Sequence, residues 1–201
     1  MADMRGQVAI VVGSSSGMGR ATARTYAQAG AKVVLAARRT DKLEELAQEI
    51  GDAAWVCATD VEDTDQVEPL IDATLERLGR VDVLVYATGT NIPERSLESL
   101  SYATWNMMIA TNLTGAFHCT KAVLPVMRAQ QGGLILYLSS GCVQVPDVSG
   151  VSYQASKCGL SGLAHGTFKE EQAHGIRTTV VFPGLCDTPL VLKPPIPTPP
   201  E

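Results

Sequence analysis

Six short apolar runs, separated by longer stretches of helical character, constrain the fold of this chain more than any other feature. The runs are nearly continuous in apolar residues, which is typical of strands covered on both faces rather than on one. They span residues 7–12, 31–37, 53–58, 81–87, 134–139 and 177–182. Strands that alternate with helices predict a parallel sheet with helices on both of its faces. We therefore expect a three-layer α/β/α fold with a doubly wound sheet.

Helix signals stand between these runs. Asp41 and Glu44 have the spacing of a capping box, and Gly51 is placed to end the helix that follows. The other expected helices cover residues 64–79, 102–129 and 152–174.

Length and charge narrow the class of protein. A chain of 201 residues is long enough for one domain with a substantial core, which we place at residues 1–192. The net charge is −5 and no Lys/Arg run is longer than Arg38-Arg39, so the basic patch of a nucleic-acid binder is missing. The first apolar run is too short for a signal peptide or a membrane span, and we expect no membrane partner.

The cysteine spacing indicates the cellular compartment, and the last residues indicate where the domain ends. Five scattered cysteines without a C-x-x-C pair favour reduced thiols in a cytoplasmic protein over a disulfide or zinc framework. The three histidines are not spaced as metal ligands, so we expect no metal site. Residues 193–201, KPPIPTPPE, contain five prolines and predict an exposed tail, the start of a truncated substrate loop.

A glycine-rich loop follows the first expected strand and opens the first helix. Its glycines are Gly13, Gly17 and Gly19, in the pattern G-x-x-x-G-x-G. Without side chains there, backbone N–H groups can approach a pyrophosphate, and the helix dipole favours its negative charge. A plain strand-to-helix turn is the alternative. Gly19 is followed by Arg20-Ala21 rather than Lys-Ser/Thr, which argues against nucleoside triphosphate hydrolysis.

The end of the second expected strand bears on which nucleotide binds. NAD-binding domains usually have an acidic residue there, which accepts hydrogen bonds from the ribose hydroxyls. This chain has Ala37, Arg38 and Arg39 instead. Arg38 can hold a 2′-phosphate through a bidentate contact, so we expect NADP(H) to be preferred, with NAD(H) a possible cofactor. Two solvated arginines are the alternative. A methyltransferase on a similar sheet would also need an acidic residue here.

Six motifs, taken in order and spacing, resemble the short-chain dehydrogenase/reductase family. They are GSSSGMG at 13–19, Asp60-Val61, Asn112, LSS at 138–140, YQASK at 153–157 and FPG at 182–184. The resemblance spans nearly the whole chain and implies a Rossmann-type, NAD(P)-dependent oxidoreductase acting on a small-molecule carbonyl or alcohol. The dinucleotide site that it implies consists of Gly13, Ser15, Ser16, Gly17, Met18, Gly19, Arg38, Arg39, Asp60, Val61, Ala87, Gly89, Tyr153, Lys157, Pro183, Gly184 and Thr188.

Tyr153 and Lys157 carry the chemistry that such a reaction needs. Hydride transfer at a carbonyl carbon requires a proton to move at the oxygen, and free tyrosine, with a pKa of about 10, accepts one poorly at neutral pH. Four residues apart on a helix, the two side chains share a face. We expect the ammonium, with a cationic nicotinamide adding to its effect, to lower the pKa of Tyr153, the general acid/base. The resemblance implies that Lys157 also holds the nicotinamide ribose. A surface tyrosine beside a solvated lysine is the alternative.

Ser140 and Asn112 complete the predicted catalytic set. Ser140 lies thirteen residues before Tyr153, just after the fifth expected strand, where its hydroxyl can stabilise charge on a substrate oxygen. Asn112 interrupts an apolar helical stripe, and the resemblance implies a link through water to Lys157 and solvent. The alternatives are a turn-forming serine and a plain interhelical hydrogen bond.

The chain departs from the family pattern in two places. The family usually ends its fourth strand with Asn-Asn-Ala-Gly, whereas residues 86–89 are Tyr-Ala-Thr-Gly. Family members also continue through a further helix and a seventh strand, so we expect this chain to be an incomplete catalytic domain. These departures leave a second function open, a nucleotide-binding regulator or scaffold of the same fold with weak catalysis.

The two long expected helices suggest a surface for self-association. Gly159, Gly162 and Gly166 lie among apolar residues and would let another helix approach closely. The resemblance implies a homo-oligomer built across these helices. Packing against the protein's own sheet is the alternative.

Overall fold

The computed structural model describes residues 3–190 and contains all six predicted strands in one sheet. The strands are β1 (Val8–Val12), β2 (Lys32–Ala37), β3 (Ala54–Ala58), β4 (Val83–Tyr86), β5 (Gly133–Leu138) and β6 (Ile176–Val181). Their order is β3-β2-β1-β4-β5-β6, and every neighbouring pair is parallel. The chain therefore starts in the middle of the sheet, builds one half outward and then crosses back to build the other. The prediction of a doubly wound parallel sheet is confirmed.

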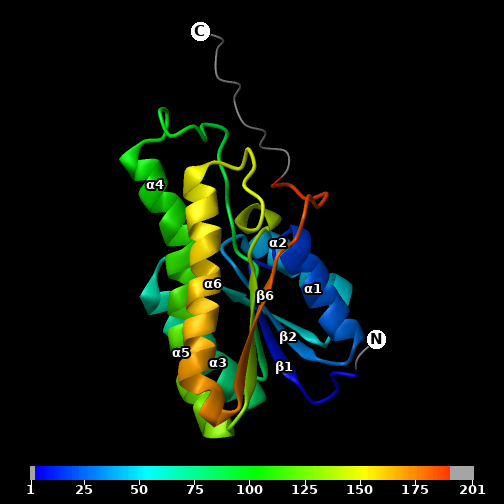
Figure 1. Ribbon diagram of the computed structural model, residues 1–201. Helices are drawn as coiled ribbons and strands as arrows, with labels where there is room; N and C mark the ends of the chain where they lie inside the picture. Colours follow the sequence, from blue (N-terminus) through cyan, green and yellow to red (C-terminus); the bar gives the residue numbers. More distant parts are fainter. Residues whose placement is uncertain (1–2, 191–201) are drawn as a thin grey trace.

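Helices cover both faces of the sheet (Figure 1). One face carries α1 (Gly17–Gln28) and α2 (Thr40–Ile50), and the other carries α3 (Thr64–Leu78), α5 (Gly115–Gln130) and α6 (Val151–Glu171). Successive side chains of a strand point to opposite faces. On β1, Ala9 and Val11 pack with the first pair of helices, and Ile10 and Val12 pack with the other three. The predicted three layers are thus present.

Burial differs between the middle and the edges of the sheet. Every residue of β1 and of β4 is buried. By contrast, β3 is only partly buried, and the exposed side chains Arg177, Thr179 and Val181 alternate with covered ones along β6. Because β6 packs on α6 with one face, the prediction of strands covered on both faces is right for the centre and wrong for these two edges.

The helix expected over residues 102–129 is interrupted. It begins as α4 (Tyr102–Ile109), passes through a π-helical turn at Ala110–Thr114 and continues as α5. A π turn closes its hydrogen bonds one residue further along the chain than an α-helix does. Apolar periodicity does not predict such an insertion, because the apolar stripe continues on both sides of it. The other long expected helix is α6 with a 3₁₀ turn at Gln172–His174.

Local capping rules hold at the start of α3 and fail at the start of α2. Asp63 caps α3, since its carboxylate accepts the N–H of Asp65 at 3.0 Å. The capping box predicted from Asp41 and Glu44 is wrong. Helix α2 begins before Asp41, with Arg39 at its N-cap and no side-chain cap.

The glycines of α6 were expected to allow either self-association or close packing within the chain, and the structure separates them. A Cβ on Gly159 would lie 2.5 Å from the Leu113 side chain, so this glycine lets α6 approach the π turn of the same chain. Gly162 and Gly166 are exposed, and a Cβ on either would meet nothing within 4 Å. Close packing within the chain therefore accounts for the first glycine and leaves the other two on the surface.

Three sequence predictions concern regions or features away from this core. The predicted proline-rich tail, residues 193–201, lies outside the described residues. Within residues 3–190, no helix is both long and apolar enough to cross a membrane. In the same span, no group of three or more His, Cys, Asp or Glu side chains is arranged to hold a metal ion.

Candidate functional site

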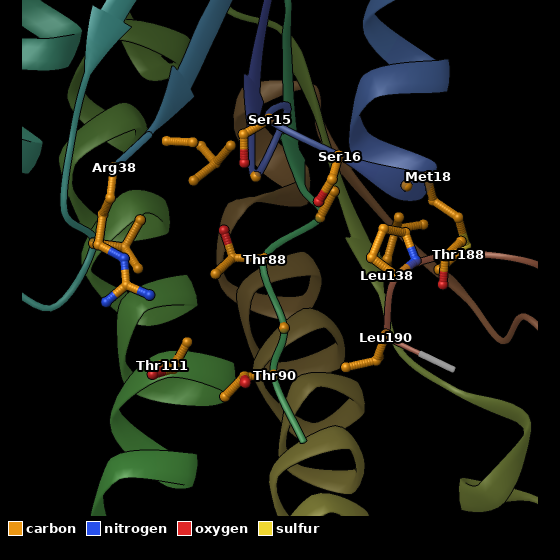
Figure 2. Close-up of a pocket in the computed structure, with 18 of the residues that line it drawn as sticks. Ser15, Ser16, Met18, Arg38, Thr88, Thr90, Thr111, Leu138, Thr188 and Leu190 are labelled. Carbon is orange, nitrogen blue, oxygen red and sulfur yellow. The ribbon is translucent and has the colours of Figure 1, made fainter. Parts of the chain in front are cut away.

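A cleft of about 350 Å³ opens at the carboxyl ends of the central strands. It includes most of the glycine-rich loop Gly13–Gly19, and we call it the glycine-loop cleft. Figure 2 shows Arg38 on one side, Thr188 on the other, and Thr88 and Thr90 on the segment between them. Ligands of open α/β sheets bind where the strand order reverses, which here is between β1 and β4. The cleft lies at that point.

Close backbone contacts explain two of the glycines. Gly13 has φ +89°, and a Cβ there would lie 2.7 Å from the backbone N of Thr88. A Cβ on Gly19 would collide with the carbonyl of Gly13. A side chain at Gly13 would push the loop away from the end of β4, and one at Gly19 would break the close packing within the loop, so the loop needs glycine at both.

The N-terminus of α1 borders the cleft. The helix begins at Gly17, its N-cap Ser16 makes no side-chain cap, and its first turn contains no acidic residue. Such an end attracts anions, because its first N–H groups lack partners within the helix. Thr188 lies over this end, since a Cβ on Gly17 would be 3.3 Å from its methyl carbon.

The two predicted arginines both line the cleft but have different partners. Arg39 donates from Nη2 to the hydroxyls of Ser15 and Ser16, each at 2.9 Å. Arg38 lies 3.9 Å from Oδ2 of Asp60, and its side chain is 65% exposed. The guanidinium fixed against the glycine-rich loop is therefore that of Arg39.

Tyr153 lies where this cleft meets a second cavity. The second cavity, of about 570 Å³, runs from the ends of β5 and β6 to the loops before α6, and we call it the adjoining pocket. Tyr153 lines both cavities and is 8% exposed. Ser140 lies close enough to the phenol to lower its pKa, and its hydroxyl accepts the N–H of Cys142 at 3.4 Å. Groups bound in the two cavities would meet at this phenol.

The predicted fall in the pKa of Tyr153 is wrong for the protein alone. Burial raises this pKa above its ordinary value, and the Ser140 hydroxyl and the charge of Arg95 oppose the rise only in part. Burial also lowers the pKa of Lys157 to about 8, so the ammonium charge is itself disfavoured in this environment. The phenol consequently stays protonated at neutral pH.

Lys157 is buried beside the phenol without bonding to it. The Nζ atom donates to the carbonyl of Leu138 at 2.9 Å and lies 5.8 Å from the centre of the Tyr153 ring. Gly89 leaves room for this side chain, because a Cβ there would be 3.0 Å from Nζ. The predicted pair therefore faces one cleft, and the ammonium meets the ring in a cation–π contact rather than the hydroxyl in a hydrogen bond.

Asn112 is fully buried in the π turn and bonds to two elements around the cleft. Its Oδ1 accepts the N–H of Thr90 at 2.8 Å, and its Nδ2 donates to the Thr90 carbonyl at 3.0 Å and to Ser156 Oγ on α6 at 3.1 Å. The interhelical hydrogen bond left open above is thus present. Among the described residues, no direct hydrogen bond joins this amide to Lys157.

Tyr86, a departure from the family pattern, ties the sheet to the π turn. It is fully buried, and its hydroxyl donates to the carbonyl of Thr111 at 2.6 Å. Gly115 makes room for it, since a Cβ there would lie 2.6 Å from the hydroxyl oxygen. Thr111 in turn donates to a carboxylate oxygen of Glu62 at 2.6 Å. The segment that carries Asn112 is therefore anchored from the sheet side.

Most of the predicted site residues share the glycine-loop cleft. Its lining includes Gly13, Ser15, Ser16, Gly17, Met18, Arg38, Arg39, Asp60, Val61, Ala87, Gly89, Tyr153, Lys157 and Thr188. Ser140, Pro183 and Gly184 line the adjoining pocket instead. Gly19 and Asn112 are buried behind these walls.

Sequence reasoning missed two groups of lining residues. The first is a set of threonines in the glycine-loop cleft, Thr59, Thr88, Thr90 and Thr111. Thr59 and Thr88 follow directly on predicted strands, and that position is the signal that would have found them. The second group forms the walls of the adjoining pocket, at 91–95 and 145–149, where the sequence carries no periodic signal.

Comparisons with known proteins agree with this architecture. The sequence model of the short chain dehydrogenase family matches residues 7–194. A cis-4-hydroxycyclohexanecarboxylate dehydrogenase from Sinomonas cyclohexanicum is 38% identical over 187 residues, covering 92% of this chain and 75% of that protein. An uncharacterized oxidoreductase from Staphylococcus saprophyticus is 36% identical over 193 residues, covering 94% and 78%. The crystal structure of a 3-ketoacyl-(acyl-carrier-protein) reductase from Brucella melitensis, complexed with NADH, superposes with a TM-score of 0.91 at 27% identity, covering 96% of this chain and 80% of that one.

Proposed function

The chain belongs to the short-chain dehydrogenase family of oxidoreductases, and from that premise we propose that it transfers a hydride between NADP(H) and a carbonyl or alcohol substrate. The observation that carries the proposal is the buried phenol of Tyr153, which lines both cavities and shares the adjoining pocket with Ser140. In this proposal the dinucleotide occupies the glycine-loop cleft and the substrate occupies the adjoining pocket.

The glycine-loop cleft has the features that a dinucleotide needs. The backbone at Gly13 has no room for a side chain, and the N-terminus of α1 has no acidic residue in its first turn, which suits a pyrophosphate. Arg38 and Arg39 line the same cleft and suit a 2′-phosphate, on which the preference for NADP(H) rests. When bound, the nicotinamide supplies or accepts the hydride.

Tyr153 serves as the proton donor when a carbonyl is reduced. Its raised pKa keeps a proton on the phenol at neutral pH, which is the state that a general acid needs. As the hydride adds to the carbonyl carbon, the C=O π electrons move to the oxygen, and the oxygen takes the phenolic proton. Ser140 donates a hydrogen bond to that oxygen while its charge develops. Protonated Lys157 then stabilises the tyrosinate that is left.

Asn112 acts as a positioning residue in this proposal. It holds both backbone groups of Thr90, which lines the cleft beside Gly89 and Lys157. Loss of this amide should move the wall against which the cofactor binds rather than remove a proton donor.

The relatives indicate which class of substrate to test first. The name of the Sinomonas protein describes a dehydrogenase of a cyclic secondary alcohol. This supports secondary alcohols and the corresponding ketones as the first substrates to test.

We also propose a cytoplasmic homo-oligomer that uses the exposed side of α5 and α6. Phe117 on α5 is 48% exposed and Phe168 on α6 is 43% exposed. Gly162 and Gly166 are open on the same helix as Phe168. A strictly monomeric mass by light scattering at tens of micromolar protein would contradict this assignment.

The experiment that tests the proposed function follows NADPH and NADH oxidation against a panel of ketones and aldehydes. We expect turnover of at least one ketone, with NADPH giving the higher kcat/KM. Equal efficiency with both cofactors would remove the NADP(H) preference. Binding of NADPH without turnover of any carbonyl would instead favour a nucleotide-binding regulator.

A further inference from the structure

The wall of the glycine-loop cleft that follows β3 contains a carboxylate to which no role has been assigned. Glu62 lines the cleft, and its Oε1 accepts a hydrogen bond from the Thr111 hydroxyl at 2.6 Å. A glutamate carboxylate offers about four lone-pair sites and no donor, and Thr111 occupies one of these sites. The side chain therefore presents an acceptor to the cleft and is held at one end.

The hydroxyl that holds Glu62 is itself held by its surroundings. Thr111 is 5% exposed in the π turn, and its carbonyl accepts the hydroxyl of Tyr86 at 2.6 Å. The residue before Glu62 is held as well, because His118 on α5 donates from Nδ1 to the Val61 carbonyl at 2.9 Å. Two adjacent residues of this wall are thus bonded to the π turn and to α5, so the wall is preorganised for a ligand.

The order of the strands indicates which part of a dinucleotide this wall faces. The glycine-rich loop follows β1, Arg38 and Arg39 follow β2, and Glu62 follows β3, the outermost strand on that side. In the proposed function the loop binds the pyrophosphate, and the two arginines bind the 2′-phosphate of the adenosine ribose. Figure 2 shows Thr111 on the same side of the cleft as Arg38. Because the wall lies one strand further out than the arginines, we place the adenine base beside it.

Asp60 is a second carboxylate on this wall, and both of its oxygens face groups of the chain. Its Oδ1 accepts the N–H of Glu62 at 3.1 Å, and its Oδ2 lies 3.9 Å from Nη1 of Arg38. The guanidinium therefore offsets part of the charge of Asp60. The partner of Glu62 is a neutral hydroxyl, which leaves the negative charge of this carboxylate to act on a ligand.

We propose that Glu62, with Thr111 as its positioning residue, accepts a hydrogen bond from the 6-amino group of the cofactor's adenine and so selects adenine over other bases. This inference rests on the proposed function, because it adds a contact to the same cofactor. In hypoxanthine a carbonyl oxygen replaces the amino group, so that one acceptor would face another. The carboxylate would then oppose binding, and a site that repels the wrong base is selective.

The test compares NADPH with deamino-NADPH, in which hypoxanthine replaces adenine and every charge is kept. Fluorescence titration of the wild-type protein measures the Kd of each. We expect deamino-NADPH to bind about tenfold more weakly, because a charge-assisted hydrogen bond is lost at a partly solvated site. NADH and deamino-NADH should give a similar ratio of Kd values, because the contact does not involve the 2′-phosphate.

Glu62→Gln keeps the shape of the side chain, and its amide can present either a carbonyl oxygen or an NH2 group. The Kd ratio should therefore fall to about twofold or less, and the lost charge does not enter the ratio because both cofactors carry the same charges. Glu68→Gln, at an exposed position of α3 that lines neither cavity, is the matched control and should leave the ratio unchanged. A wild-type ratio near one, or a ratio that Glu62→Gln leaves unaltered, would overturn the inference.

A second pair of variants tests the positioning role of Thr111. Thr111→Val removes the hydroxyl with little change of shape and should reduce the Kd ratio by about threefold, whereas Thr111→Ser keeps the hydroxyl and should preserve the ratio. Thr74→Val is the control, because this buried hydroxyl donates to the Leu70 carbonyl at 2.7 Å and lines neither cavity. A general loss of stability would weaken both cofactors alike and leave the ratio unchanged. Equal ratios in wild type and Thr111→Val would refute the positioning role.

Binding needs no turnover, so the result separates this inference from the proposed function. If no ketone is reduced while the Kd ratio depends on Glu62, the base contact stands and hydride transfer is refuted. If ketones are reduced and the ratio is lost in Asp60→Asn but kept in Glu62→Gln, the contact belongs to Asp60 and the inference is overturned. Failure of both NADPH and NADH to bind would overturn the inference and the proposed function together.

Discussion

The glycine-loop cleft and the adjoining pocket share Tyr153 but are built in opposite ways. The cleft is formed by the ends of central strands and by a loop whose glycines leave no space between backbone segments. The pocket is formed by loops that carry exposed apolar side chains such as Val148 and Leu185. Backbone geometry determines the first cavity, whereas side-chain identity determines the second.

Because of this difference, substitutions in the two cavities should have different effects on activity. A substitution in the cleft should affect every substrate alike, because it alters a site that all reactions use. A substitution in the pocket should alter which substrate is preferred. Tyr153, at the junction, should belong to both classes.

The largest effect is expected for Tyr153→Phe, which keeps the ring and removes the transferable proton. We expect kcat to fall by about 10²-fold or more for every substrate, since general acids contribute roughly that much. The Kd for NADPH should change by less than about threefold. Stopped-flow turnover and fluorescence titration of NADPH measure the two quantities. Retention of more than about a tenth of wild-type kcat would contradict the assignment.

Gly19→Ala should produce the next largest effect, confined to the cleft. The added Cβ would collide with the carbonyl of Gly13, and backbone cannot move aside as a flexible side chain can. We expect a loss of about 2 kcal/mol or more in the free energy of unfolding, together with weaker NADPH binding. Urea denaturation and the NADPH titration measure both.

Gly162→Ala is the matched control for that substitution. It lies in α6, where a Cβ would meet nothing within 4 Å. At protein concentrations where the chain is monomeric, alanine there should increase stability by about 0.5–1 kcal/mol, because glycine is unfavourable inside a helix. Equal losses in the two variants would show that close backbone contact is not what distinguishes the cleft.

Arg39→Ala should change the preference between NADPH and NADH rather than the preference among substrates. Its guanidinium is fixed by Ser15 and Ser16 on the glycine-rich loop, so we expect the Kd for NADPH to rise by about tenfold while that for NADH changes little. Arg38→Ala should have a smaller effect because that side chain is more loosely held. Arg24→Ala, which removes a surface pair with Glu49, is the control. Parallel rises for NADPH and NADH would refute a 2′-phosphate contact.

The smallest expected effect concerns the stability of the cofactor-free protein as a function of pH. The pKa of Lys157 is about 8 in the folded protein, against an ordinary value of 10.5. Between these values the unfolded chain holds a proton that the folded chain has lost, so this group makes stability rise as pH increases through about 8. Below about pH 8, the unfavourable contribution of Lys157 to the free energy of unfolding no longer changes with pH.

Lys157→Met should remove this contribution. From about pH 7 to about pH 9, wild type should gain about 1 kcal/mol more than the variant in the free energy of unfolding. Urea denaturation at the two pH values measures the difference. Identical pH dependence in both proteins would show that Lys157 is not the buried titrating group.

The same contrast explains what the sequence could predict. The sheet was predictable because β1 and β4 are buried on both faces and so carry an unbroken apolar signal. The cleft was predictable because glycine is required where backbones touch, and because Tyr153 and Lys157 are one helical turn apart. These properties are local, and local sequence records them.

The remaining features depend on tertiary packing. The pKa of Tyr153 rises because of burial, which four-residue spacing does not determine. The choice between Arg38 and Arg39 depends on which side chain reaches the serines of another segment. Arg95 lies in a loop of no periodicity, and the packing of that loop around Gly150 brings it to the wall of the pocket.

Because of the π turn at Ala110–Thr114, the number of residues in this helix determines which faces α4 and α5 present to the rest of the protein. An α-helix advances by about 100° per residue, so one residue more or fewer changes which faces the two ends present. On α4, Met108 packs with Cys142 and Tyr153, whereas Val123 on α5 packs into the main core. Deleting one residue from the turn would yield a more regular helix with unchanged helical content, yet one of these faces would turn away from its partner. Insertions and deletions here should therefore disturb the protein more strongly than most substitutions.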